Sequence, residues 1–110
     1  MKWYIKEDVL VFKLKAKFMG GPECDDAKQT LLDFMNRGYK RVVMDFSELD
    51  WTNSAGIGAI ISCYHTLRRN EGELKFASPT PKVEFYLNIT KLNQVFEVYS
   101  SVDEAVESFQ

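Results

Sequence analysis

Residues 41–58 read RVVMDFSELDWTNSAGIG, and this stretch determines the fold class. Its first six residues are mostly apolar and β-branched, a composition typical of a strand covered on both faces. Four of the residues 48–53 are polar, and the segment is expected to form a connecting loop. From Ser54 to about Asn70, apolar residues recur at the period of a helix, and Gly72 follows the last of them. A buried strand followed by a helix is the repeating unit of an α/β fold.

The segments before this stretch predict a hairpin and a helix. Residues 3–6 and 9–18 are strand candidates, separated by a short charged turn. Lysines alternate with apolar residues along the second of them, which is the period of a strand with one wet face. Pro22 begins a helix whose C-terminal cap is expected at Gly38.

The segments after residue 72 continue the alternation of strands and helices. Residues 73–77 and 95–99 predict strands. Thr80 is the expected N-cap of a short helix between them, because a proline follows it. A Ser-x-x-Glu capping box at residues 101–104 opens a last helix.

The predicted element order is therefore ββαβαβαβα. Repeated alternation with short links predicts a mostly parallel central sheet of about five strands, with about four crossover helices and an N-terminal β-hairpin. A length of 110 residues is that of one α/β domain, so residues 1–110 are expected to form a single unit. The order of the strands stays open.

Composition and charge argue against several classes of partner. The formal net charge is −2, and the basic clusters noted at residues 13–17 and 68–69 are interpreted as solvated faces, so no nucleic-acid partner is expected. The N-terminus is broken by charges and no run reaches about 20 apolar residues, which predicts a cytoplasmic protein without a membrane contact. Cys24 and Cys63 are expected to be reduced and buried.

Motifs for catalysis are also missing from the sequence. It contains no GxGxxG, GxxxxGK[ST] or GxSxG, no spacing of metal ligands, and no motif for a cofactor. His65 and Cys63 are two residues apart on the predicted helix, so their side chains project in different directions. A small enzyme with Ser54 or Cys63 as nucleophile remains an alternative, but it lacks a positioned base. The chain is therefore interpreted as a binding protein and not as an enzyme.

The start of the helix at Ser54 is the candidate functional site. The first turn of a helix carries unpaired N–H donors and roughly half a positive charge, and small residues leave this one bare for another surface to approach. Either Asn53 or Ser54 could be its N-cap. A phosphate on Ser54 would be tolerated by the fold but would add about −1.5 to −2 charges to an interface built over it.

The same segment resembles the signature of STAS domains, in particular the bacterial anti-sigma factor antagonists. The resemblance is carried by the strand-end triplet Met44-Asp45-Phe46 and by Asn53-Ser54-Ala55-Gly56-Ile57-Gly58. It continues through residues 70–74, 87–96 and 101–105, in the same order along the chain. Two positions depart from the family pattern, since the family has Asp where Asn53 stands and Ser or Thr where Ala55 stands.

The resemblance implies an anti-sigma factor antagonist that binds an anti-sigma factor with serine kinase activity and releases the sigma factor. Phosphorylation of Ser54 would break the contact, and a serine phosphatase would restore it; Thr52 and Ser47 are weaker acceptor candidates. The alternative is a STAS interaction module without phosphorylation, in a signalling or transport complex. A weak homodimer stays open. The residues expected to contact the partner are Thr52, Asn53, Ser54, Ala55, Gly56, Ile57 and Gly58.

Overall fold

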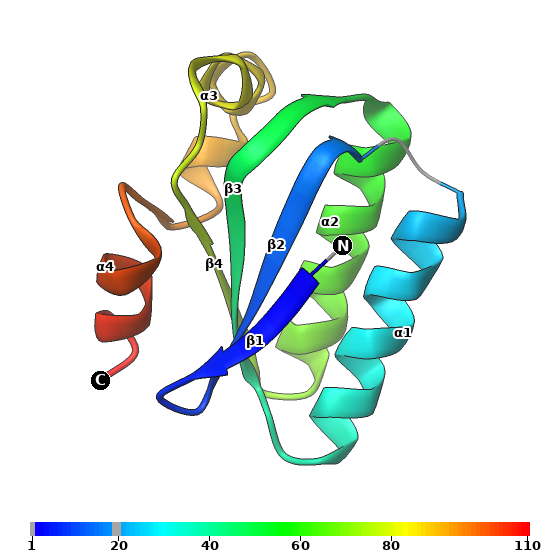
Figure 1. Ribbon diagram of the computed structural model, residues 1–110, viewed down its shortest axis with the longest axis vertical. Coiled ribbons are helices and arrows are strands. Elements are labelled where there is room, and N and C mark those ends of the chain that lie inside the picture. Colours follow the sequence, from blue (N-terminus) through cyan, green and yellow to red (C-terminus); the bar gives the residue numbers. More distant parts are fainter. Residues whose placement is uncertain (1, 19–20) are drawn as a thin grey trace.

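The computed structural model describes residues 2–18 and 21–110 and shows an α/β domain with a five-stranded sheet in the order β1-β2-β3-β4-β5 (Figure 1). The first two strands are antiparallel, and every later pair is parallel. This confirms the predicted hairpin and the mostly parallel sheet. The strands are β1 (Lys2–Lys6), β2 (Val9–Phe18), β3 (Arg41–Thr52), β4 (Glu73–Ala77) and β5 (Val98–Tyr99). The helices are α1 (Pro22–Asn36), α2 (Ser54–Arg69), α3 (Pro81–Ile89), the 3-10 turn η1 (Leu92–Gln94) and α4 (Val102–Glu107).

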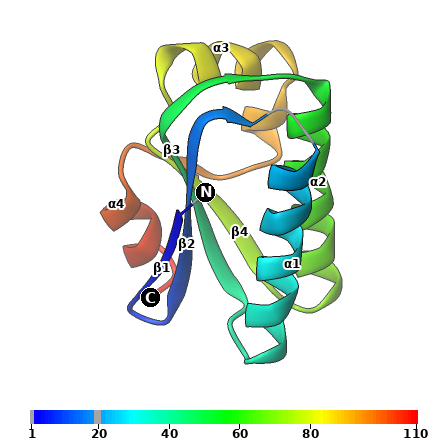
Figure 2. The same cartoon turned by 45° about the vertical axis from the view of Figure 1, so that its right-hand side comes forward.

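Helices cover the sheet unequally on its two faces. Both long helices, α1 and α2, lie side by side on one face, whereas only α4 lies on the other (Figures 1 and 2). Alternate residues of each strand point to opposite faces, so neighbours along β3 belong to different clusters. Val42, Met44 and Phe46 join the large cluster beneath α1 and α2, and Val43 joins the small cluster beneath α4.

Strand β3 is longer than its sequence indicates. The prediction ended the strand at Phe46 and placed a loop at residues 48–53, but β3 continues to Thr52. Leu49 is buried in this extension, and β2 pairs with it through two register shifts. The loop prediction was wrong because it relied on the polar residues of this segment and gave no weight to Leu49 and Trp51, which alternate with them at the period of a strand. The extension stays paired with β2 and carries the chain past the end of β4 to the start of α2.

The last strand is shorter than predicted. The sequence placed it at residues 95–99, whereas β5 contains only Val98 and Tyr99, and Val95 is 58% exposed. The chain forms η1 just before it, which uses the preceding residues in a turn. The predicted caps are confirmed, because Thr80 accepts from the N–H of Val83 at 3.3 Å and Ser101 accepts from the N–H of Glu104 at 3.1 Å.

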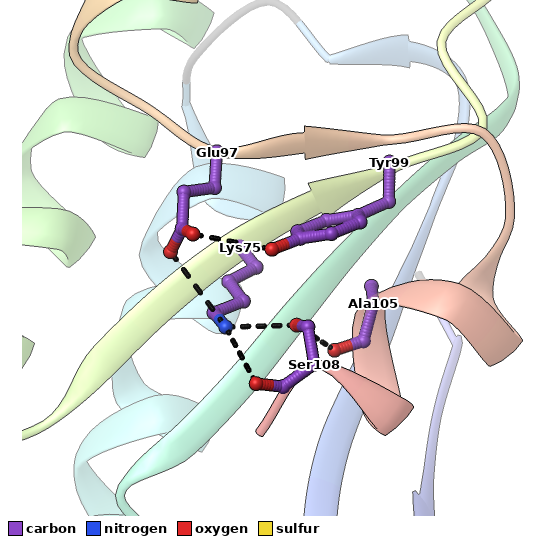
Figure 3. Close-up of polar contacts among 5 residues, drawn as sticks. All are labelled: Lys75, Glu97, Tyr99, Ala105 and Ser108. Atoms are coloured by element: carbon purple, nitrogen blue, oxygen red, sulfur yellow. Dashed lines mark hydrogen bonds and ion pairs between the residues drawn. The ribbon is translucent and has the colours of Figure 1, made fainter. Parts of the chain in front are cut away.

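A buried lysine fastens α4 to the sheet (Figure 3). Lys75 of β4 is 5% exposed, and its ammonium donates to the side-chain hydroxyl of Ser108 at 2.8 Å and to its carbonyl at 3.3 Å. Glu97 lies 3.6 Å from the same ammonium, and the ring of Phe109 has its centroid 4.3 Å away. A cation at the last carbonyls of a helix also opposes its dipole. Lys75 therefore holds the C-terminal end of α4.

Candidate functional site

The N-terminus of α2 is capped by Asn53. Its side-chain oxygen accepts a hydrogen bond from the N–H of Gly56 at 3.0 Å, and its carbonyl accepts from the N–H of Ile57 at 2.9 Å. The backbone of Asn53 is extended, with φ −135° and ψ −174°, as an N-cap requires. Of the two caps that the sequence allowed, the structure has Asn53.

Because Asn53 does the capping, the Ser54 hydroxyl has no structural task. Ser54 is the first residue of α2 and is exposed to solvent. Among residues 2–18 and 21–110, no group forms a hydrogen bond with its hydroxyl. The first turn of α2 contains no acidic residue, so its positive end is not neutralised from within the helix. The site therefore offers an accessible hydroxyl at an electropositive helix end.

The other predicted contact residues differ in how much surface they offer. Ala55 and Gly58 are exposed, and a Cβ at Gly58 would meet no atom within 4 Å. Ile57 is half-buried, as is the capping residue. Thr52 is 2% exposed and Gly56 is buried, so these two residues offer little surface and support the first turn of α2 from its interior side.

Closely packed apolar side chains lie beneath the first turns of α2. A cavity of only about 10 Å³, close to the volume that one water needs, lies beneath them. It is enclosed mainly by aromatic and aliphatic side chains, so the site is a surface and not a ligand pocket. The lining residues are Phe46, Leu49, Thr52, Ile57, Ile60, Phe76, Val83, Tyr86, Leu87 and Leu92.

Helix α3 adds two exposed apolar side chains that the sequence reasoning missed. Phe85 is 61% exposed and Ile89 is 59% exposed, and they are four residues apart on one helix face. Helix α3 borders the site, since its Tyr86 and the α2 residue Ile57 line the same cavity. The sequence contained a signal for this surface. A helix that buries Val83 turns Phe85 and Ile89 to its opposite, exposed side.

Cys63, one of the two nucleophiles of the enzymatic alternative, is not activated. Burial raises the pKa of the Cys63 thiol to about 11, so the thiol is protonated at neutral pH. His65 is exposed and stacks edge-on against Tyr64. Within the described part of the chain, no three potential ligands are grouped to hold a metal ion. None of the helices described is both long enough and apolar enough to cross a bilayer.

Comparison with known proteins shows what this geometry is related to. The sequence pattern of the STAS domain matches residues 2–105. The chain belongs to the STAS domain family. Its relatives include a protein of Thermotoga maritima, 28% identical over 75 residues, and BtrV of Bordetella bronchiseptica, 30% identical over 76 residues. Both are provisionally named anti-sigma factor antagonists; the alignments cover 68% and 69% of this chain and 66% of each relative.

Solved structures show the same STAS fold. The Thermotoga maritima protein superimposes with a TM-score of 0.84 at 25% identity, covering 97% of this chain and 92% of that one. The anti-sigma factor antagonist SpoIIAA in its unphosphorylated form gives 0.83 at 14% identity, covering 98% and 94%. The Bacillus SpoIIAA in its phosphorylated form gives 0.78 at 14% identity, covering 99% and 98%. At this identity SpoIIAA is evidence for the fold alone.

Proposed function

We propose that this STAS domain is an anti-sigma factor antagonist whose contact with an anti-sigma factor kinase is switched off by phosphorylation of Ser54. The observation that carries the proposal is the exposed Ser54 hydroxyl at the first residue of α2, beside a cap that leaves it unused. The names of the relatives favour an anti-sigma factor as partner. We place the complex in the cytoplasm, where sigma factors act.

A phosphate at this position would change the interface more than the fold. The helix end favours an added anion by about 0.3–1 kcal/mol, and Ser54 points away from the core. The same group brings about −1.5 to −2 charges and a hydration shell to a surface that a partner must desolvate. A loss of about 2.7 kcal/mol in interface energy weakens binding roughly a hundredfold. The phosphorylated domain would therefore stay folded and release its partner.

We expect Asn53 to set the rate at which Ser54 is phosphorylated. The family has Asp at this position, and Asn keeps the cap while lacking a charge next to the acceptor. We expect Asn53→Asp to keep the hydrogen bond to the N–H of Gly56 and to change the rate of phosphoryl transfer to Ser54. A serine phosphatase is the expected enzyme for the reverse step.

The decisive experiment captures the partner and then tests the switch. Unmodified protein is used to isolate a binding partner from the native cell, and the pure pair is incubated with ATP. We expect one phosphate, mapped to Ser54 by mass spectrometry, and release of the partner. Ser54→Glu should weaken the complex roughly a hundredfold. Ser54→Ala should bind the partner but not respond to ATP.

Ser47→Glu is the matched control, because Ser47 is another exposed serine on the approach to α2. This variant carries the same added charge and should bind like the unmodified protein. A phosphate mapped to Ser47 or to the buried Thr52 would contradict the proposal. So would partner release by ATP in the Ser54→Ala variant.

The second candidate is a STAS interaction module without phosphorylation, as in signalling or transport complexes. The observation in its favour is that Asn53 and Ala55 stand where the family signature has Asp and Ser or Thr. This function predicts a partner whose affinity is the same for unmodified protein and for Ser54→Glu. It also predicts no phosphate on Ser54 when the isolated complex is given ATP.

A further inference from the structure

A second charged surface lies at the amino end of β3. Residues 37–41 read RGYKR and connect α1 to β3; we call them the basic turn. Its three cations, Arg37, Lys40 and Arg41, are exposed. Within residues 2–18 and 21–110, no carboxylate forms an ion pair with any of them. The basic turn is distinct from the basic clusters at residues 13–17 and 68–69.

The basic turn has a fixed backbone. The N–H of Gly38 donates to the carbonyl of Met35 at 3.0 Å, and the N–H of Tyr39 donates to that of Phe34 at 3.0 Å. With Gly38 at φ 95°, these two bonds form a Schellman motif that ends α1. The ring of Tyr39 also packs edge-on against Phe34, with centroids 5.5 Å apart. The cations are therefore presented by a structured turn, and binding would order little backbone.

Contacts with α1 and β4 fix two of the cationic residues. The guanidinium of Arg37 lies over the ring of Phe34, 5.3 Å from its centroid. The carbonyl of Lys40 accepts from the N–H of Glu73 at 2.9 Å. The chain passes so closely here that a Cβ on Gly72 would lie 2.7 Å from that carbonyl oxygen. Compensation of the α1 dipole accounts for Arg37, but Lys40 and Arg41 lie beyond the helix.

The cations of the basic turn line a hollow with a volume of about 480 Å³, opposed by one acidic side chain, Asp8. An adjoining hollow of about 410 Å³ shares Lys40 and Arg41 but is bordered by Glu71 and Glu73. Three positive charges against one favour an anionic occupant in the first hollow. The flanking carboxylates disfavour a nucleic acid, whose phosphates would extend past them, and the chain as a whole is acidic. A short peptide segment with a few carboxylates fits both conditions.

We infer that the basic turn is a docking site for an acidic segment of a second protein, and that it works independently of Ser54. The hollow lies at the amino end of β3 and Ser54 follows its carboxyl end, so the two sites occupy opposite ends of the molecule (Figure 1). The longest axis of the domain is 33 Å, several times the Debye length of about 8 Å at physiological ionic strength. A charge added at one site is therefore not felt at the other. The domain would connect two proteins, of which only one is controlled by Ser54.

The test uses a fluorescein-labelled octaglutamate peptide and fluorescence anisotropy at about 50 mM NaCl, where charge contacts are weakly screened. We expect saturable binding that is lost when salt is raised tenfold. Arg37→Glu with Arg41→Glu should weaken it at least about tenfold, because charge pairs become charge repulsions. The matched control is Lys15→Glu with Lys17→Glu, which changes the net charge equally at two exposed lysines of β2. This control should bind within about twofold of the unmodified protein.

Several outcomes would overturn the inference. Equal loss in both double variants would mean attraction without a site, and no saturation below about 1 mM would mean no useful affinity. Displacement of the peptide by millimolar inorganic phosphate, or by a DNA duplex at lower concentration than the peptide itself, would assign the hollow to those ligands. Ser54→Glu should leave peptide binding unchanged; a loss there would contradict the independence of the two sites. Failure of the kinase-binding proposal leaves all these expectations as they are.

Discussion

The two faces of the sheet are built on different principles. Beneath α1 and α2, a large cluster of aliphatic and aromatic side chains fills the space, including the rings of Phe46, Phe76 and Phe96, which contact one another at steep angles. Beneath the six-residue α4, the apolar cluster is small and a buried ammonium completes the contact. One face is held by apolar area, which is insensitive to direction, and the other depends on a few directed bonds. We therefore expect the face beneath α1 and α2 to be rigid and the face beneath α4 to open locally.

The largest expected effect is the protection of a thiol from alkylation by the packing beneath α1 and α2. Cys63 of α2 is buried, and burial raises the pKa of its thiol to about 11 from an ordinary 9.0. At pH 8 the thiolate is therefore about a hundredfold rarer in the folded protein than in the unfolded chain. We expect alkylation by iodoacetamide to be at least that much slower without urea than with it, measured by mass spectrometry.

The same thiol gives a pH dependence of stability. Its pKa is raised in the folded state, so the unfolded chain loses the proton first as pH rises. The contribution of the thiol to the free energy of unfolding is complete below about pH 9. It decreases between about pH 9 and pH 11. Replacement by Ala should remove that decrease. Rapid alkylation of Cys63 at pH 8 would mean that this face also opens locally.

A matched pair of valines compares the two faces directly. Val42 and Val43 are adjacent in β3 and both 0% exposed, but they point into the large and the small cluster respectively. Val42→Ala should lower the free energy of unfolding by about 2–3 kcal/mol, and Val43→Ala by about 1–2 kcal/mol. The reason is that the short α4 can shift to fill the cavity left by the removed methyl groups more easily than two long helices can. Urea denaturation measures both losses, and equal losses would refute the distinction.

Removal of the buried ammonium should loosen α4 alone. Lys75→Met keeps most of the length of the side chain but leaves the hydroxyl and carbonyl oxygens of Ser108 without the donor from Lys75, at a cost of about 1–2 kcal/mol. We expect faster amide hydrogen exchange in α4 and unchanged exchange in α2. Ser108→Ala provides the second arm of a double-mutant cycle. If the two changes are additive, their contact does not hold the helix.

The smallest expected effect is at the functional site. Asn53→Ala removes the cap of α2 and should cost about 1 kcal/mol, whereas Asn53→Asp keeps an acceptor for the N–H of Gly56 and should cost less. Thermal unfolding followed by circular dichroism measures both variants. A large loss for Asn53→Asp would mean that the amide nitrogen, and not the oxygen, matters here.

The sequence predicted those parts of the fold that depend on local chemistry. Caps at Gly38, Thr80 and Ser101 were identified because short polar or glycine side chains act on the backbone a few residues away. The extension of β3 was missed although Leu49 and Trp51 alternate with polar residues, because four polar residues within six favoured a loop; its pairing with β2 through two register shifts has no local signal. Strand order and the unequal cover of the two faces depend on the whole chain and have no local signal.

At the candidate site, the sequence predicted where the helix starts but not what surrounds that start. It could not choose between Asn53 and Ser54 as cap, because both side chains favour that position. Only the three-dimensional structure brings Tyr86 of α3 next to Ile57 of α2, and with it the exposed Phe85 and Ile89. The basic turn has no comparable sequence signal, because the hollow shared by Arg37, Lys40 and Arg41 is formed only when the chain turns at Gly38.

Gly58 lowers the stability of the domain at the proposed contact surface. A methyl group there would touch nothing, and alanine in the middle of a helix is favoured over glycine by roughly 0.5–1 kcal/mol. Packing gives no reason for the glycine, and the proposed function supplies one, because the vacant space above the helix lets a partner approach the backbone. An engineer who optimised this protein for thermostability would replace Gly58 early, and we expect that change to weaken partner binding.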